Sequence, residues 1–213
     1  MHINQTQTYA LVNALDKFLA SAITSIVEEN VDKKIHQNMG IRLQARYGVD
    51  ITKSIENFHM FDATLREFFG AKADTLEKDF VTRLISLDTT KKASTSIVIQ
   101  DQELARLILE SYGNREKRRI MDITLKAPAP ILEILENCKI PKSSGYRIIS
   151  ELVENGLLIE EGYVSSEGKR AITYGTLFEN VSIDIEKDGI VVKVAVRENT
   201  FHESFLVKIL LGL

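Results

Sequence analysis

The sequence of 213 residues has a single cysteine, Cys138, no tryptophan and only four histidines. One cysteine excludes an intramolecular disulfide and every metal motif built from several cysteines. His2, His36, His59 and His202 have no spacing typical of paired metal ligands. We therefore expect no metal site and no cofactor.

Long apolar runs are also lacking, and no stretch approaches the length needed to cross a bilayer. The first residues show no basic stretch followed by an apolar core and a cleavage site. Glycine-rich phosphate loops, nucleophile elbows and carboxylates spaced around a substrate are missing as well. These absences favour a cytoplasmic protein that contacts no membrane and is not an enzyme.

The composition, 44% hydrophobic and 27% charged, is ordinary for a globular chain, and the length suits two domains. The formal net charge is −3. Its distribution is more informative than its sum, because residues 1–100 carry twelve basic and twelve acidic side chains, whereas residues 113–175 carry ten and nine. These ten basic residues are Arg115, Lys117, Arg118, Arg119, Lys126, Lys139, Lys142, Arg147, Lys169 and Arg170.

Helical periodicity dominates the first half of the chain. It predicts helices over residues 8–29, 31–47, 51–55, 58–69 and 74–87. Gly48 and Gly70 are expected as helix stops, Asp50 as a cap, and Asp74 with Glu77 as a capping box. We interpret residues 1–90 as an all-helical signalling or dimerisation domain. Residues 91–100, polar and β-branched without periodicity, are interpreted as a linker.

From residue 101 the pattern changes. Asp101 and Asn114 are expected to cap two helices, and Pro130 to open a third at its first helical position. A helix over about residues 142–155 follows a tight turn, and two strands come next, separated by a tip within residues 165–170. This order predicts a winged helix-turn-helix over residues 101–177.

Residues 178–213 complete the chain with an extra β-hairpin and a terminal helix. The hairpin is expected to turn at Asp188 and Gly189. Thr200 with Glu203 reads as a capping box for one continuous apolar helix. That helix is either a dimer interface or an element docked on its own chain. The predicted fold class is therefore α+β, mainly α.

Ile149 and Leu152 are expected to anchor the helix over residues 142–155 on the core, which turns its polar side outward. The first turns of such a helix enter the major groove, where arginine can hold a guanine edge and hydroxyls can bond bases or phosphates. The tip would reach the DNA backbone or the minor groove. The predicted DNA-binding residues are Lys142, Ser143, Ser144, Tyr146, Arg147, Ser150, Lys169 and Arg170.

The segments "IPKSSGYRIISELVENGLL" and "SSEGKRAITYGTL" together resemble the winged helix-turn-helix of ArsR-like transcriptional regulators, archaeal members in particular. The resemblance covers roughly residues 101–177. It implies DNA contact by the serines, the tyrosine–arginine pair and the basic tip named above. Two features depart from the family pattern. Gly145 replaces an apolar residue, at a cost of about 1 kcal/mol in helix stability relative to alanine, and the cysteine pair of metal-sensing members is absent.

The segments "LQARYGVDI" and "FDATLREFFGAKADTLEKDFVTRL" resemble a small helical output domain of ammonia-oxidising archaea. The resemblance implies a signalling or assembly module that meets an effector or a protein partner. A helical bundle that only mediates dimerisation is the alternative reading of the same segment.

Together these observations predict a sequence-specific DNA-binding transcriptional regulator that acts as a homodimer on double-stranded DNA. The alternative is a winged-helix module that docks proteins within a transcription or signalling assembly. Six glutamates around the basic surface support that alternative, because they oppose a polyanion. They are Glu133, Glu136, Glu151, Glu154, Glu160 and Glu161.

Overall fold

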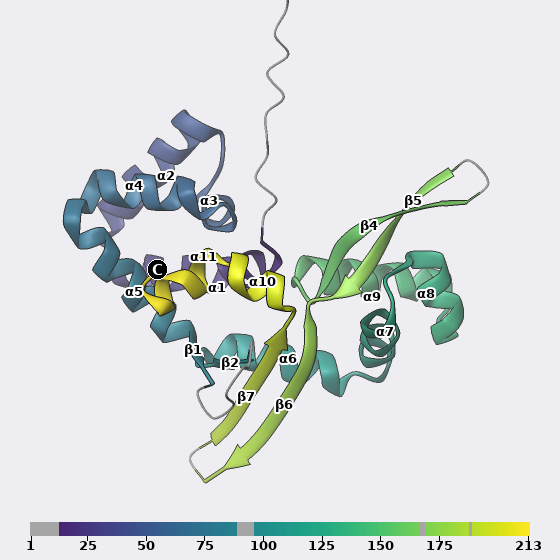
Figure 1. The fold of residues 1–213 in the computed structure, drawn as a ribbon. Helices are drawn as coiled ribbons and strands as arrows, with labels where there is room; N and C mark the ends of the chain where they lie inside the picture. Colours follow the sequence, from purple (N-terminus) through teal and green to yellow (C-terminus); the bar gives the residue numbers. More distant parts are fainter. Residues whose placement is uncertain (1–12, 89–95, 167–168, 188) are drawn as a thin grey trace, which may run out of the picture.

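The computed structural model describes residues 13–88, 96–166, 169–187 and 189–213, and it is α+β, mainly helical (Figure 1). The first group of elements comprises α1 (Ala14–Asn30), α2 (Lys33–Tyr47), α3 (Ile51–Glu56), α4 (Phe58–Phe69), a 3-10 turn (Gly70–Lys72) and α5 (Ala73–Leu84). The beginning of the predicted first helix, residues 8–12, lies outside the described residues. None of the described helices is both long and apolar enough to cross a membrane.

The predicted cap at Asp50 and the predicted stop at Gly48 are both confirmed. The Asp50 carboxylate accepts a hydrogen bond from the Lys53 amide at 2.7 Å and so begins α3. Gly48, at φ 71°, ends α2 in the left-handed conformation that glycine adopts without strain.

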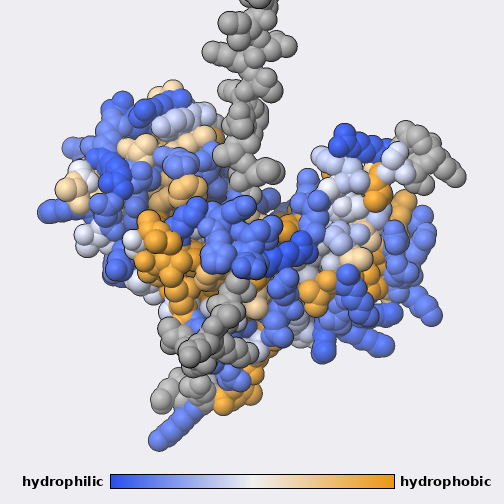
Figure 2. Space-filling model, viewed as in Figure 1, coloured by the Kyte–Doolittle hydropathy of each residue, from blue (hydrophilic) through white to orange (hydrophobic). Residues whose placement is uncertain are grey.

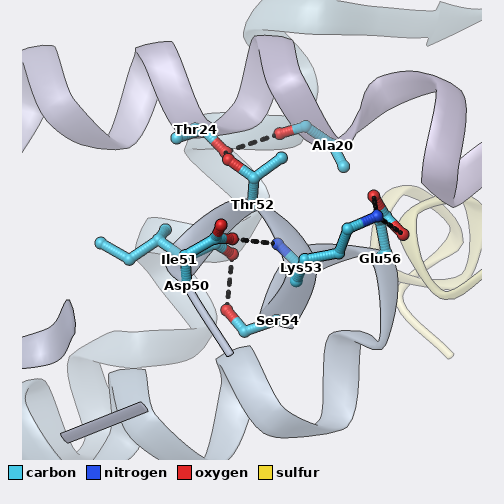
Figure 3. A network of polar contacts seen from close by, with 8 residues as sticks. All are labelled: Ala20, Thr24, Asp50, Ile51, Thr52, Lys53, Ser54 and Glu56. Carbon is cyan, nitrogen blue, oxygen red and sulfur yellow. Dashed lines mark hydrogen bonds and ion pairs between the residues drawn. The ribbon is translucent and has the colours of Figure 1, made fainter. Parts of the chain in front are cut away.

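A small polar network fastens α3 to α1 (Figure 3). The Thr24 and Thr52 hydroxyls lie 3.0 Å apart, and the Thr24 hydroxyl also donates to the Ala20 carbonyl at 2.8 Å. Within α3 the buried Ser54 hydroxyl donates to the Ile51 carbonyl at 2.6 Å. The buried Ser54 hydroxyl and the half-buried Thr24 and Thr52 hydroxyls therefore have partners, which offsets the cost of taking them out of water.

The prediction for α5 is wrong at both ends. The helix begins at Ala73 without a side-chain cap, so Asp74 lies inside its first turn. Glu77 is buried at 5% exposure and caps nothing. At the other end Leu87 belongs to a strand, β1 (Ile85–Leu87), so the first ninety residues are not all helical.

The predicted linker over residues 91–100 is wrong for its last part, because Ser96–Ile99 form strand β2. Ile97 and Ile99 are buried in alternation with their neighbours, and β2 pairs antiparallel with β1 on one side and β7 on the other. Residues 91–95 lie outside the described residues. In the sequence, the four alternating residues of β2 directly follow a polar stretch and are too few to indicate a strand.

The last two strands are β6 (Phe178–Glu186) and β7 (Gly189–Val196), and the sheet order is β1-β2-β7-β6. Glu186 pairs with Gly189, so Gly189 lies in β7 rather than in the predicted turn. The position of residue 188 lies outside the described part of the chain. This sheet combines two strands from the middle of the sequence with two from its last part.

The second group of elements follows β2. It comprises α6 (Gln102–Gly113), α7 (Arg115–Lys126), β3 (Ala129–Pro130), α8 (Ile131–Cys138), α9 (Lys142–Glu154), β4 (Leu158–Ser166) and β5 (Lys169–Thr176). The Asp101 and Asn114 side chains cap α6 and α7 as predicted. Pro130 is not the first helical residue. It is extended and pairs with Thr173 in the sheet β3-β5-β4, and α8 begins after it.

Helix α1 joins the two groups. The Phe18 ring meets the Phe178 ring edge-on, with centroids 5.2 Å apart. Gly156, at φ 71° after α9, lies so close to α1 that an added Cβ would sit 3.1 Å from the Phe18 Cα. Both the left-handed backbone and the close approach therefore require glycine here.

The tail is two helices, α10 (Glu198–Glu203) and α11 (Phe205–Leu211), so the prediction of one helix capped by Thr200 is wrong. The chain breaks at Ser204, whose hydroxyl accepts from the Val207 amide at 3.1 Å and caps α11. Helix α11 packs on α5 of its own chain. In Figure 2 an apolar patch marks the C-terminal end of α11, where Leu211 and Leu213 are exposed.

A buried carboxylate, Asp16 of α1, explains this break. It is 1% exposed and accepts hydrogen bonds from the Ser204 hydroxyl at 2.5 Å and the amides of Phe205 at 2.9 Å and Leu206 at 3.4 Å. Burial raises the pKa of Asp16, although these hydrogen bonds act in the opposite direction. The carboxylate thus accepts hydrogen bonds from free amides at the start of α11, although Asp16 and these residues are at least 188 positions apart in the sequence.

We expect Asp16→Ala to lower the free energy of unfolding by about 2–3 kcal/mol, because it leaves buried donors without an acceptor. The exposed cap Asp32 of α2 is the matched control. Asp32→Ala should cost about 1 kcal/mol. Urea unfolding at pH 7 measures both, and equal losses would contradict the role given to Asp16.

Candidate nucleic-acid interface

The inner face of α9 is packed into the core. Ile148, Ile149 and Leu152 are all at most 4% exposed, which confirms the predicted inward orientation of Ile149 and Leu152. Gly145 also lies on this face, against α8. A Cβ there would lie 2.3 and 2.7 Å from the Leu135 methyl carbons. The glycine therefore permits close contact between α8 and α9, a benefit that the helix-propensity argument did not reveal.

The outer face of α9 carries all six predicted residues of this helix. Five of them are exposed: Lys142, Ser143, Tyr146, Arg147 and Ser150. Ser144 is half-buried, and its hydroxyl donates to the Pro141 carbonyl at 3.2 Å. A guanidinium, a phenol and several hydroxyls thus share one surface, a set that can bond to phosphates and base edges.

The start of α9 is fixed by the turn before it. Residues 139–141 connect α8 to α9, and Lys139 has φ 53°, the only positive φ among the described residues other than glycine. Ile140 is buried at 7% exposure and holds the turn on the core. Within the described chain no side chain caps the first amides of α9. Free amides at the N-terminus of a helix can donate hydrogen bonds to an anion such as a phosphate.

The basic surface is smaller than the sequence suggested. The Lys117 ammonium lies 2.5 Å from the Glu151 carboxylate and is only 14% exposed, so it ties α7 to α9. Arg118 lies 3.9 Å from Asp122 on its own helix. The Lys117–Glu151 pair joins residues 34 apart, and no local pattern in the sequence signals it.

The β4–β5 hairpin starts beside α9, and its strands extend away from the helices of the second group (Figure 1). The Arg170 guanidinium lies 3.9 Å from the centroid of the exposed Tyr163 ring, on the paired strand. Sequence reasoning missed Tyr163, although alternation along the strand could have placed it on an open face. Residues 167–168 and the side chain of Lys169 lie outside the described part of the hairpin.

Among the described residues no group of three or more histidine, cysteine or acidic side chains is placed to hold a metal ion. Cys138 is buried, and this burial raises the pKa of its thiol, which disfavours the reactive thiolate. The arrangement is suited to polar and electrostatic contact with a ligand.

No protein-family model, curated protein or solved structure gives a significant match to the chain.

We expect Gly145→Ala to lower the free energy of unfolding by about 1 kcal/mol, because overpacking against Leu135 outweighs the gain in helix propensity. Gly40 of α2 is the control, since a Cβ there meets no atom within 4 Å. Gly40→Ala should stabilise by about 0.5–1 kcal/mol. Denaturant titration checks both signs, and stabilisation by Gly145→Ala would contradict the close packing.

Proposed function

We propose that residues 101–177 form a winged helix-turn-helix that binds double-stranded DNA, and that the protein is a sequence-specific transcriptional regulator. Helix α9 would lie in the major groove, and the β4–β5 hairpin would be the wing on the backbone or the minor groove. The order α7, β3, α8, three-residue turn, α9 and hairpin supports this proposal. So does the pairing of the short β3 with β5 in the three-stranded sheet.

The observation that carries the proposal is the outer face of α9. Arg147 is exposed there and forms no ion pair with any described residue. The buried Ile149 and Leu152 fix its direction. Arginine in that position can donate two hydrogen bonds to one guanine edge. Lys142 and the serine hydroxyls at the start of the helix can contact phosphates.

A homodimer is part of the proposal. One recognition helix reads only a few base pairs, and two of them about one helical turn apart multiply affinity and discrimination. A two-fold protein should therefore leave a nearly palindromic footprint on its site.

Protein docking is the second candidate, favoured by the acidic and apolar residues near α9. Glu133, Glu136, Glu154 and Glu160 are exposed, and Leu132 and Tyr163 expose apolar surface. Two further glutamates oppose DNA less than the sequence implied. Lys117 neutralises Glu151, and Arg197 lies 2.6 Å from Glu161.

We expect Arg147→Ala to weaken binding to the preferred duplex by about 1–3 kcal/mol and to relax preference at one base position. The duplex is selected from a random library and titrated by fluorescence anisotropy. Arg46→Ala on α2 makes the same charge change in the first group of helices and should leave affinity unchanged. Unchanged affinity and preference in Arg147→Ala would overturn the orientation proposed for α9.

Salt separates the two candidates. Binding to DNA should weaken as salt rises, with log K falling by about 0.9 per log unit of salt for each phosphate contacted. A protein-docking module should show neither this slope nor an enriched sequence. Titrations from low to physiological ionic strength, with the selected duplex and a scrambled one, distinguish these outcomes.

A further inference from the structure

A hollow of about 470 Å³ is lined by residues of α4, α5 and α11. These three helices lie far from α9 (Figure 1). Phe58, Phe205 and Ile209 form part of its lining, together with several charged side chains. Its volume is within the range of cavities that hold small molecules. Asp16 holds the start of α11 in this position. Helix α11, near the end of the chain, therefore forms one wall of the hollow, and α4 and α5 from the first half form the other two.

Glu77 is the distinctive residue of this lining. It is 5% exposed, and its Oε1 atom is buried without a hydrogen-bond partner among the described residues. Burial and a hydrogen bond to Asp62, which requires Glu77 to be protonated, together raise the pKa of Glu77 to about 8. Near neutral pH the two carboxyl groups therefore hold one proton between them.

The other charged groups facing Glu77 are already satisfied or lie towards the rim. The Arg66 guanidinium donates to Asp62, with 2.6 Å between Nε and Oδ1, and to Asp74. Lys78 on α5 and His59 on α4 are exposed. A buried acceptor on Glu77 is thus left without a donor, which is costly unless a ligand or a proton supplies one.

An aromatic wall adjoins this acidic corner. The Phe58 and Phe205 rings stack with centroids 6.3 Å apart, and the His59 ring meets Phe205 at 4.3 Å. The Lys208 ammonium lies 5.1 Å from the Phe205 centroid and forms no ion pair with the described residues. The hollow therefore combines an unsatisfied acceptor, an apolar surface and a cation on α11.

We propose that this hollow binds a small molecule that carries an ammonium group on an apolar or aromatic body. The ammonium group donates hydrogen bonds to Glu77 and Asp62, and the shared proton leaves to solvent. The body lies against Phe58 and Phe205, where rings and aliphatic chains lose contact with water. This binding site is independent of α9 and of any contact with DNA.

Simple amines and amino acids both carry an ammonium group, and contact with Lys208 would distinguish the two classes of ligand. A simple amine uses only the acidic corner and the aromatic wall. An amino acid adds a carboxylate that can pair with the Lys208 ammonium. Phenethylamine and phenylalanine are therefore the two probes, and 3-phenylpropionate, which has the ring without the ammonium group, is the control that should not bind.

Isothermal titration of the full chain at several pH values tests the proposal without DNA. We expect one saturable site and the release of nearly one proton, measured by repeating the titration in buffers of different ionisation enthalpy. Because the proton must leave, the apparent Kd should fall about tenfold per pH unit between pH 6 and 7.5. Phenylalanine binding more tightly than phenethylamine, with the difference lost in Lys208→Ala, would identify amino acids as the class.

Glu77→Gln is the decisive variant, since glutamine matches the protonated acid in shape but cannot lose a proton. It should weaken binding of either probe at least tenfold and abolish the pH dependence. Glu67→Gln, on the same helix as Asp62 but paired with Arg42 outside the hollow, should leave both unchanged. Saturable binding by Glu77→Gln equal to that of the unaltered chain would overturn the proposal.

Two further outcomes, measured on the unaltered chain alone, would also test the proposed binding site. The absence of saturation with both probes up to about 10 mM, weaker than a useful small-molecule affinity, would overturn the proposal. Binding without proton release between pH 6 and 7.5 would also overturn it, even if Glu77→Gln fails to fold in circular dichroism. DNA binding can succeed or fail separately, because neither probe nor variant touches α9.

Discussion

The buried Asp16 carboxylate is the contact on which the arrangement of the chain depends. It sits on α1 and closes the start of α11, so the first and last described helices are held together by three hydrogen bonds. The same helix carries Phe18, which packs against Phe178 of β6 and against the backbone at Gly156. Helix α1 therefore positions the tail, the four-stranded sheet and the end of α9 at once.

Local signals in the sequence were sufficient for most helices. A cap such as Asp50 or Asn114 and a stop such as Gly48 act within a few residues, so their effect is legible without knowing the fold. No local signal of this kind predicted strands β1 and β2. β2 is stabilised by pairing with β7, almost a hundred residues later, and its own four residues carry too little pattern.

In the candidate sites, too, features set by local pattern could be predicted, and features set by contacts between distant elements could not. The inward and outward faces of α9 follow from helical period, and exposure of Arg147 agrees with that reading. The Lys117–Glu151 pair and the Arg170–Tyr163 contact depend on how elements meet, and the sequence does not reveal them. Glu77 was misread for the same reason, since a capping role and a buried role have the same local spacing.

The two sheets are joined with almost no intervening chain. Leu177 is the only residue between β5 and β6, is 2% exposed, and donates its amide to the Leu157 carbonyl at 3.0 Å. The Arg197–Glu161 ion pair adds a second tie between the end of β7 and β4. A tilt of the β4–β5 hairpin is therefore coupled directly to β6 and β7, because one buried, hydrogen-bonded residue and one ion pair join the two sheets.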